Sequence, residues 1–467
     1  MSNRRSFLQR AFGLGASLVA APTLLAAERG NTRTNHTPAH NVPVITPDVG
    51  DMPFTMDGEV KVFHLVAQVL KQQIAPNKII DVWGFNGSAP GPTFQVNQGD
   101  RVRIVFENQL PEPCSIHWHG FEDKIAFDGM PGISQEPTRP GEKFVYEFDI
   151  HQTGTYFYHS HMAMQEMAGM LGAFIMHPRE PYRPHCDKDF VLHFQEYAVL
   201  PNNTVPNTMK MEFNWLTING KVGPVATPLI VRLGDRVRIR MINLGMDHHP
   251  IHIHGNTFYT TGTEGGRIPE AGWWPGNTVL VGSGQARDVE FVANNLGDWM
   301  LHCHLPHHMM NQMSNDVMGT PTTNGPISNA QSMDAMRDMQ TQMSSGTPAV
   351  SGEQMSGMMS MDMSQQAMQQ QEKSIAPGAN NIPNFPQDGY MEGPTMSMEH
   401  LPMLQKPENY GLRAGWSASM QGMMNFVRVL PPDKYDEVIG RMRDAKRPDD
   451  PYASLLRSNV QSNGGAA

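Results

Sequence analysis

Four pairs of histidines are the residues of this sequence whose type and spacing are best suited to chemistry. In each pair one residue separates the two histidines, so on a β-strand both imidazole rings point to the same face. Neutral imidazole is a good ligand for copper and leaves coordination positions open for oxygen. Together the pairs can hold a cluster of three copper ions. They are His117 and His119, His159 and His161, His252 and His254, and His302 and His304.

Cys303 stands between the two histidines of the last pair, so on a strand its thiol points to the opposite face. His308 and then Met313 follow at steps of five residues, and His249 precedes the third pair. One cysteine, two histidines and a weak axial methionine form a blue-copper site. We therefore predict a mononuclear copper held by Cys303, His249, His308 and Met313. Cys303 would be the point at which electrons enter.

These motifs stand on an internal repeat. The segment from Gly99 to Gly120 and the segment from Gly234 to Gly255 have the same length, begin with Gly-Asp-Arg-Val-Arg-Ile and end in a histidine pair followed by Gly. Alternating strand-like runs and closely spaced turn residues predict an all-β chain with Greek-key packing. We expect two such β domains, at residues 50–182 and 183–320.

The four motifs, in this order, resemble those of the multicopper oxidases, the family of laccases, ascorbate oxidase and bacterial cuprous oxidases. The resemblance covers roughly residues 55–318 and implies two cupredoxin-like domains. It implies oxidation of a reductant coupled to reduction of dioxygen to water, with one type 1 copper, one type 2 copper and a type 3 pair. By that likeness His117 and His252 would hold the type 2 copper. His119, His159, His161, His254, His302 and His304 would hold the type 3 pair.

The short stretch between His161 and His249 leaves no room for a middle domain. The layout resembles the two-domain, laccase-like branch, in which the cluster lies between the first domain of one subunit and the second domain of its neighbour. The implied assembly is a homotrimer, because two different surfaces must meet head to tail around a ring.

Two other functions, nitrite reduction and copper sequestration, compete with oxygen reduction. The copper nitrite reductases also have two such domains but hold the blue copper in the first, where this chain has Ser160 and Cys114 at the places of Cys303 and His249. A copper-sequestering protein without activity would not need the electron-transfer strand around Cys303. Oxygen reduction is therefore favoured, with Cu(I) as the expected reductant and phenols, Mn(II) or Fe(II) as further possibilities.

Asp128 follows the first histidine pair at a position where similar enzymes have an acidic residue near the cluster. We expect it to move protons to reduced oxygen. The alternative is a structural turn residue, since Asp before Gly is common in turns. Some relatives have a glutamate directly after the type 1 histidine, where this chain has Met309.

The N-terminus and the net charge indicate where the protein works. Residues 1–27 resemble a twin-arginine export signal, with Arg4-Arg5 before Phe7-Leu8 and an apolar stretch, although an ordinary secretory signal would look similar. No later run is apolar enough to span a bilayer. We expect a periplasmic or otherwise extracytoplasmic protein, in which Cys114 and Cys186 could form a disulfide. The net charge of −10 argues against nucleic-acid binding.

The C-terminal third is rich in methionine, and the chain has 36 Met in all. Residues 321–385 read as a low-complexity, mostly disordered linker, and residues 386–467 as an extension with a short helix starting near Pro431. The thioethers could bind Cu(I) and feed the type 1 site, or buffer copper for loading the enzyme. The third reading is a linker whose methionines are incidental. We favour Cu(I) binding.

Overall fold

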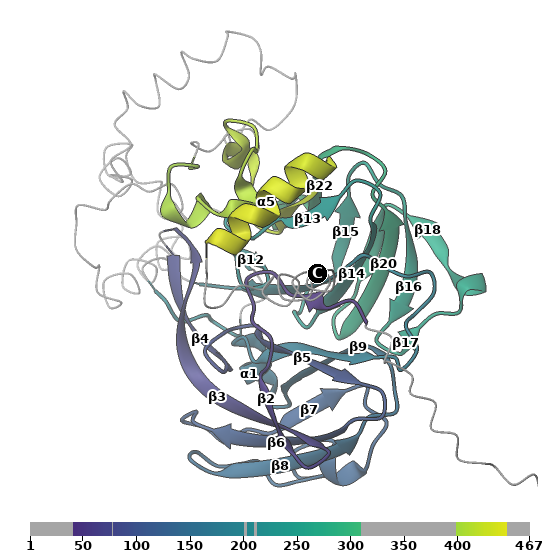
Figure 1. Cartoon of the computed structure of the whole chain (residues 1–467). Coiled ribbons are helices and arrows are strands. Elements are labelled where there is room, and N and C mark those ends of the chain that lie inside the picture. The colour runs from purple at the N-terminus through teal and green to yellow at the C-terminus, as the bar shows by residue number, and fades with distance from the viewer. Residues whose placement is uncertain (1–40, 77, 200–202, 210–212, 310–397, 446–467) are drawn as a thin grey trace, which may run out of the picture. The chain divides into compact units, whose positions relative to one another are not determined.

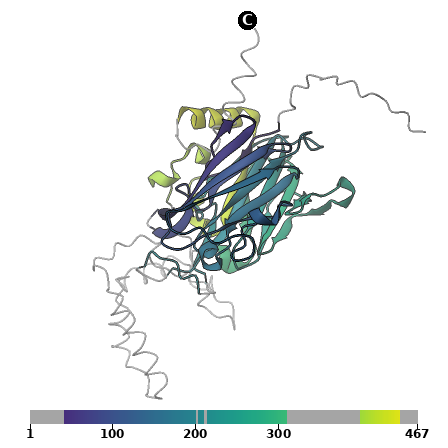
Figure 2. The same cartoon turned by 90° about the horizontal axis from the view of Figure 1, so that it is seen from below.

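The computed structural model describes residues 41–76, 78–199, 203–209, 213–309 and 398–445. The expected signal segment, Met313, the methionine-rich linker and parts of the C-terminal extension lie outside these residues. The described chain is built mainly from strands, which form two pairs of sheets (Figures 1 and 2). The all-β prediction is confirmed. Within the described residues, no helix is long and apolar enough to cross a membrane.

The first pair of sheets encloses a core of aromatic side chains. Across it, the Trp118 and Tyr146 rings lie 5.2 Å apart, and Phe94 packs edge-on against Tyr158. One sheet contains β2 (Phe54–Asp57), β3 (Val60–Ala75), β4 (Lys78–Phe85), β6 (Arg101–Asn108) and β8 (Lys143–Asp149). The other contains β5 (Gly91–Asn97), β7 (Ile116–His119), β9 (Gly154–Ser160) and β10 (Leu171–His177). The histidine pairs of this half stand on β7 and at the end of β9.

The second pair of sheets has an aliphatic core that includes Cys303. One sheet contains β1 (Val44–Ile45), β11 (Lys188–Tyr197), β12 (Trp215–Ile218), β14 (Arg236–Asn243), β16 (Phe258–Thr263), β17 (Gly266–Arg267), β18 (Trp274–Gly276) and β20 (Gln285–Val292). The other contains β13 (Leu229–Arg232), β15 (His249–Ile253), β19 (Thr278–Val281), β21 (Gly297–Cys303) and β22 (Met424–Leu430). The ligand motifs of this half stand on β15 and β21, which are hydrogen-bonded neighbours.

Short helices join or flank the strands. They are η2 (Ile125–Phe127), α1 (Ala163–Met167), η3 (Glu270–Gly272), η4 (Pro306–Met309), η7 (Pro402–Leu404), η8 (Pro407–Asn409), η9 (Trp416–Ser419) and α5 (Pro432–Asp444).

The internal repeat is visible in the backbone. The turn after β4 and the turn after β12 each pair an asparagine with a glycine, both at positive φ: 48° and 90° for Asn86 and Gly87, 51° and 71° for Asn219 and Gly220. These are the angles of the tight turn that matches the twist of a β-hairpin. The same local sequence therefore builds the same corner in both halves.

Strand β22 comes from the segment that the sequence assigned to a C-terminal extension. It lies between β13, to which it is parallel, and β21, to which it is antiparallel, so it is an inner strand of the sheet that carries Cys303. Helix α5 follows it and contacts β13 and β22 (Figure 1). The helix buries Val438, Ile439 and Met442 in the same core. The apolar run before Pro431 is evident in the sequence. Its partner strands could not be identified, because the long methionine-rich stretch separates the run from them in the sequence.

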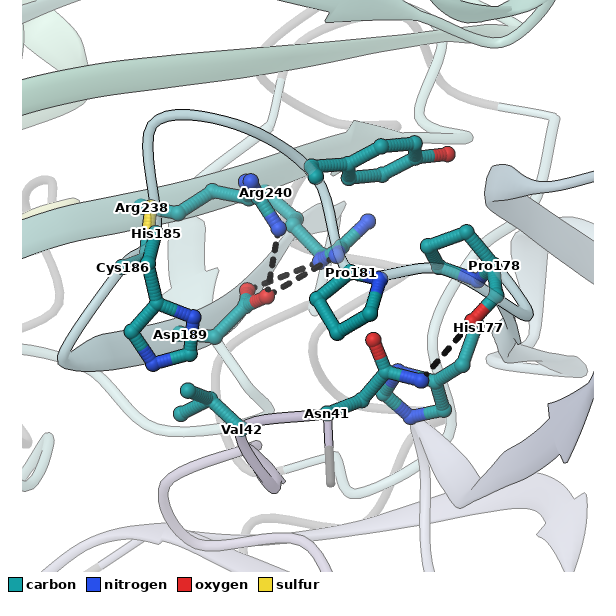
Figure 3. Close-up of a pocket in the computed structure, with 11 residues that line it drawn as sticks. Asn41, Val42, His177, Pro178, Pro181, His185, Cys186, Asp189, Arg238 and Arg240 are labelled. Carbon is teal, nitrogen blue, oxygen red and sulfur yellow. Dashed lines mark hydrogen bonds and ion pairs between the residues drawn. The ribbon is translucent and has the colours of Figure 1, made fainter. Parts of the chain in front are cut away.

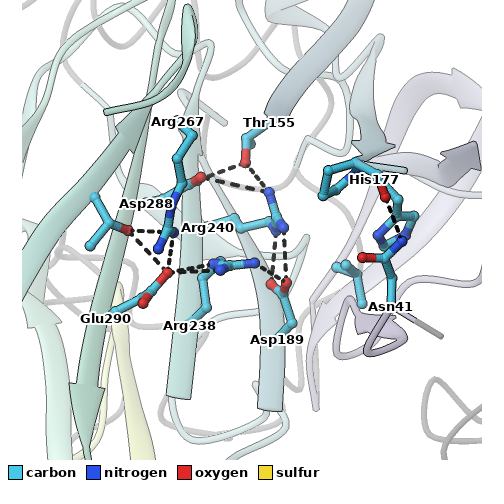
Figure 4. Close-up of polar contacts among 12 residues, drawn as sticks. Asn41, Thr155, His177, Asp189, Arg238, Arg240, Arg267, Asp288 and Glu290 are labelled. Atoms are coloured by element: carbon cyan, nitrogen blue, oxygen red, sulfur yellow. Dashed lines mark hydrogen bonds and ion pairs between the residues drawn. The ribbon is translucent and has the colours of Figure 1, made fainter. Parts of the chain in front are cut away.

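The two halves meet through an apolar patch and a buried polar network. Phe157 and Ile175 of the first half pack with Ile242 and Leu244 of the second. Beside them, Arg240 donates to Thr155 Oγ1 over 2.7 Å and to both oxygens of Asp189 (Figure 4). Thr155 in turn donates to Asp288 over 2.6 Å. This network ties β9, which carries His159, to the second half of the chain.

A small cavity of about 20 Å³ lies next to this network, enough for roughly one water molecule. Its lining includes His177, Cys186 and Asp189 (Figure 3). Cys186 and Cys114 are both buried and both free thiols in this structure, so the disulfide that the sequence permitted is not formed.

Candidate metal centres

Three ligand atoms converge in a buried pocket of the second half. His249 Nδ1 and His308 Nδ1 are 3.2 Å apart, and Cys303 Sγ lies 3.8 Å from the first and 3.5 Å from the second. All three residues are at most 1% exposed. A point equidistant from these atoms lies about 2 Å from each, the length of a bond from a first-row transition metal to nitrogen or sulfur.

The pocket is positioned by three elements. Cys303 ends β21, His249 begins β15, and His308 lies in η4. Met423, just before β22, connects two of them: its carbonyl accepts from the Cys303 N–H over 3.1 Å, and its N–H donates to the His308 carbonyl over 2.9 Å. The C-terminal strand therefore holds the two ligands at their backbone.

The distal nitrogens of both imidazoles face carboxylates. His249 Nε2 is 3.2 Å from Glu196 Oε2, and His308 Nε2 is 3.3 Å from Asp247 Oδ2. Each ring can thus donate its proton outward and turn an unprotonated Nδ1 toward the other ring. Two lone pairs facing each other beside a sulfur are repulsive unless a cation lies between them, so the donor set fits a bound copper.

Burial sets the protonation of this pocket. Burial, with His249 close by, lowers the pKa of His308 to about 4, so its imidazole is neutral at ordinary pH. Burial also raises the pKa of the Cys303 thiol to about 12. A thiolate here therefore needs a nearby cation, and binding of a metal ion would release the thiol proton.

The histidines of the first half form one cluster. Ligand atoms of His117, His119 and His159 all lie within 4.8 Å of one another, and the His161 ring is 5.3 Å from that of His117. Nδ1 of His117 donates to the Asp128 carbonyl over 2.7 Å, and Nδ1 of His159 donates to the Ser160 carbonyl over 2.9 Å. Both rings therefore keep Nε2 free for a metal.

Two carboxylates stand behind this cluster. Asp128 Oδ1 lies 3.5 Å from His117 Nδ1, and Glu166 Oε2, on α1, lies 3.2 Å from His159 Nδ1. Burial, followed by the neighbouring imidazoles, lowers the pKa of His119 to about 4. The His119 imidazole is thus neutral at ordinary pH and able to bind a metal, and the acidic groups lie on the outer side of the cluster.

The histidines of the second half form a separate cluster on the outer face of β15 and β21. Nε2 of His254 and Nε2 of His302 are 3.1 Å apart, and the His252 ring lies 5.6 Å from the rings of both His302 and His304. Nδ1 of His252 donates to the Asn277 carbonyl, and Nδ1 of His302 donates to the Cys303 carbonyl. His254 and His304 are exposed.

The two clusters make no ring contact with each other in the described part of the chain. Ring contacts join histidines inside each cluster, but in the described part of the chain none joins a histidine of β7 or β9 to one of β15 or β21. Each cluster offers four imidazoles on a partly open face.

The structure places the described ligand candidates of the sequence in three groups, one pocket and two histidine clusters, with Asp128 beside the first cluster. Met313 lies outside the described residues. Sequence reasoning missed Glu166, Glu196 and Asp247. Asp247 and Glu166 stand within five residues of a proposed ligand, which could have marked them. Glu196 lies on a distant strand and gave no local signal.

Two family models described as multicopper oxidase match this chain, one over residues 68–181 and the other over residues 198–323. The chain belongs to the multicopper oxidase family. Both matched segments contain the ligand motifs described above, and the family implies copper as the metal.

Individual relatives match only part of this multicopper oxidase. Copper resistance protein A of Escherichia coli is 34% identical over 134 residues, which are 29% of this chain and 22% of that protein. A probable nitrite reductase-hydroxylamine oxidoreductase fusion protein of Kuenenia stuttgartiensis is 30% identical over 283 residues, 55% of this chain and 31% of that protein. This chain thus spans less than a third of the length of these two curated relatives.

A solved structure is covered more fully. The blue copper oxidase of Nitrosomonas europaea matches with a TM-score of 0.50 and 30% identity, over 53% of this chain and 80% of that one. The likeness supports the cupredoxin fold of both halves.

Proposed function

We propose that this multicopper oxidase oxidises a one-electron reductant and couples that oxidation to the four-electron reduction of dioxygen to water. The observation that carries the proposal is the His249, Cys303 and His308 pocket, because its sulfur and two unprotonated nitrogens suit one copper. Bound copper would supply the one-electron chemistry that the side chains lack. The protein would supply buried, neutral and oriented ligands.

The proposed centres follow the family pattern. The type 1 copper would be held by His249, Cys303, His308 and Met313. The type 2 copper would be held by His117 and His252. The type 3 pair would be held by His119, His159, His161, His254, His302 and His304.

The three-copper cluster requires imidazoles from both halves, and the two histidine clusters are separate within the described chain. We therefore propose a homotrimer in which the first half of one subunit faces the second half of the next. The repeated use of two different surfaces favours a closed ring. Exposed apolar side chains near each cluster, such as Ile125 and Leu280, support such a contact because association would bury them.

Asp128 is proposed to move protons toward reduced oxygen. Its carboxylate is partly exposed and 3.5 Å from His117 Nδ1, while its carbonyl already fixes that ring. The carboxyl is therefore free to exchange protons with solvent, while the backbone does the positioning.

The expected reductant is Cu(I), with phenols, Mn(II) and Fe(II) as further candidates. The methionine-rich linker at residues 321–385 begins 13 residues after His308 in the sequence. That closeness in sequence supports delivery of Cu(I) by its thioethers to the type 1 pocket. Export by the signal segment to the periplasm or another extracytoplasmic compartment remains part of the proposal.

Nitrite reduction and passive copper storage are less well supported. At the place of the type 1 pocket, the first half has Cys114 and Ser160, with Sγ and Oγ 3.7 Å apart. This pair has no imidazole, so a blue copper in the first half is disfavoured. Storage would not require the buried Cys303 next to a histidine cluster.

Oxygen uptake by copper-loaded, full-length protein tests the proposal. Cu(I) and a phenol would be supplied in parallel, and the Cys303→Ser variant would be the control. Uptake with four electrons per dioxygen and no peroxide supports it. Copper binding without uptake from any reductant would instead support a storage protein.

A further inference from the structure

Glu196 lies on β11 behind the type 1 pocket and is fully buried. Its Oε1 accepts the Asp247 N–H over 2.8 Å, and its Oε2 faces His249 Nε2 at 3.2 Å. Asp247 in turn places its own carboxylate 3.3 Å from His308 Nε2. The Glu196 carboxylate thus contacts His249 directly and positions His308 indirectly, through Asp247.

The two groups that contact Glu196, the Asp247 N–H and His249 Nε2, fit a carboxylate better than an amide. In the tautomer that turns an unprotonated Nδ1 of His249 into the pocket, Nε2 carries the ring proton and is a donor, as is the Asp247 N–H. Two donors need two acceptor oxygens, which only the ionised carboxylate offers. A glutamine of the same shape has one acceptor and one donor, so one of the two contacts would become a donor–donor conflict.

The charge of Glu196 has no fixed cationic partner. In the described part of the chain, no Lys or Arg forms an ion pair with it, whereas the equally buried Glu290 is paired with Arg236, Arg238 and Arg267. A buried carboxylate without such a partner is costly. A cation bound to the imidazole that it holds would offset that cost.

The chain packs closely around this carboxylate. A Cβ atom at Gly245 would lie only 2.0 Å and 2.3 Å from the two carboxylate oxygens of Glu196. The loop before His249 therefore approaches the carboxylate without leaving room for a side chain, and this confines Glu196 to the position that reaches both donors.

We propose that Glu196 is the positioning residue of the type 1 centre, which aligns both imidazoles and lowers the reduction potential of the copper by favouring Cu(II). The inference rests on the proposed type 1 copper. A negative charge hydrogen-bonded to a ligand stabilises the more highly charged metal ion, and such outer contacts also orient the ligand.

The test compares copper-loaded, full-length wild type with Glu196→Gln. The readouts are the type 1 absorption and electron paramagnetic resonance spectra and a redox titration of the blue band. Glu196→Gln should raise the reduction potential and change the spectra. The control is Glu290→Gln. Glu290 is equally buried in the same half, but within the described chain it contacts arginines and none of the pocket residues. Its substitution should lower the stability of the protein and leave the reduction potential of the copper unchanged.

Two further variants separate charge from position. Glu196→Asp keeps the charge but shortens the reach, so it should alter the spectra and raise the potential less than Glu196→Gln does. Gly245→Ala keeps the charge of Glu196 but displaces its carboxylate, so it should also change the type 1 spectra. This variant tests the inference if Glu196→Gln fails to fold. Type 1 spectra and potential identical to wild type in both Glu196→Gln and Gly245→Ala would overturn the inference. A wild type with no type 1 signal would instead overturn the proposed function.

Discussion

The type 1 pocket and the two histidine clusters are assembled in opposite ways. The pocket takes its ligands from one half of one chain, buries them completely and orients their distal nitrogens with carboxylates. The histidine clusters each take four imidazoles from one half and leave them on a partly open face. The difference teaches that the fold of one chain completes the Cys303 pocket by itself. Under the proposed function, association of subunits would complete the three-copper cluster.

The largest expected effect comes from Cys303→Ser. Loss of the thiolate removes the ligand that gives a type 1 copper its blue colour, so colour and turnover should both disappear. Copper bound at the histidine clusters should remain. Absorption spectra, oxygen uptake and copper content measure the three quantities. Retained turnover would show that electrons enter elsewhere.

Two deletions should distinguish the role of the methionine-rich segment from that of the C-terminal strand β22. Removal of residues 321–385 should slow the oxidation of Cu(I) and leave that of a phenol unchanged. A chain ended after residue 320 should lose the type 1 signal altogether, because it lacks β22 and the Met423 contacts to Cys303 and His308. Equal Cu(I) rates in the internal deletion and the full chain would rule out delivery by the segment.

Asp128→Asn should reduce turnover by about a hundredfold, because general acid catalysis is lost while the His117 ring stays fixed by the Asp128 carbonyl. The effect should grow as the pH rises and solvent protons become scarce. Asp123→Asn, an exposed acid of the same loop, is the matched control. If the rate and the pH profile of Asp128→Asn are unchanged, Asp128 has only a structural role in the turn.

Stability of the metal-free protein should fall as the pH is lowered from about 6.5 toward 4. Burial lowers the pKa of His308 and of His119 to about 4, and it does the same to His177 and His193, which lie outside the three groups. The unfolded chain binds protons in this window and the folded chain does not, so acid favours unfolding. Chemical denaturation at several pH values measures this, and a flat profile would contradict it.

The smallest expected effect is that of Thr155→Val. The change removes the acceptor of Arg240 and the donor to Asp288 without leaving a large cavity. Stability should fall by about 1–3 kcal/mol, while the type 1 spectrum stays unchanged. Denaturant unfolding tests this, and a spectral change would mean that the two halves are coupled more closely than the contacts indicate.

Much of the site could be predicted from the sequence, because its ligands follow local rules. Alternation along a strand places His302 and Cys303 on opposite faces whatever surrounds them. Strand β22 could not be placed, since its pairing with β21 spans the methionine-rich stretch and leaves no local mark. Glu196 was missed for the same reason: it reaches His249 only because β11 and β15 belong to one packed core. Separate histidine clusters in the two halves were expected from the resemblance to the two-domain branch, but the backbone carbonyls that orient His117 and His252 are a property of the fold.

Subunit mixing tests most directly whether the cluster forms between chains. A His161→Ala variant lacks an intact first cluster, and a His304→Ala variant lacks an intact second one, so each alone should be inactive. Co-assembled in equal amounts, they should recover about a quarter of wild-type oxygen uptake, because a quarter of the contacts around a head-to-tail ring then join two intact clusters. No recovery in mixed assemblies, with full copper loading of the type 1 pocket, would contradict the account and place the whole cluster within one chain.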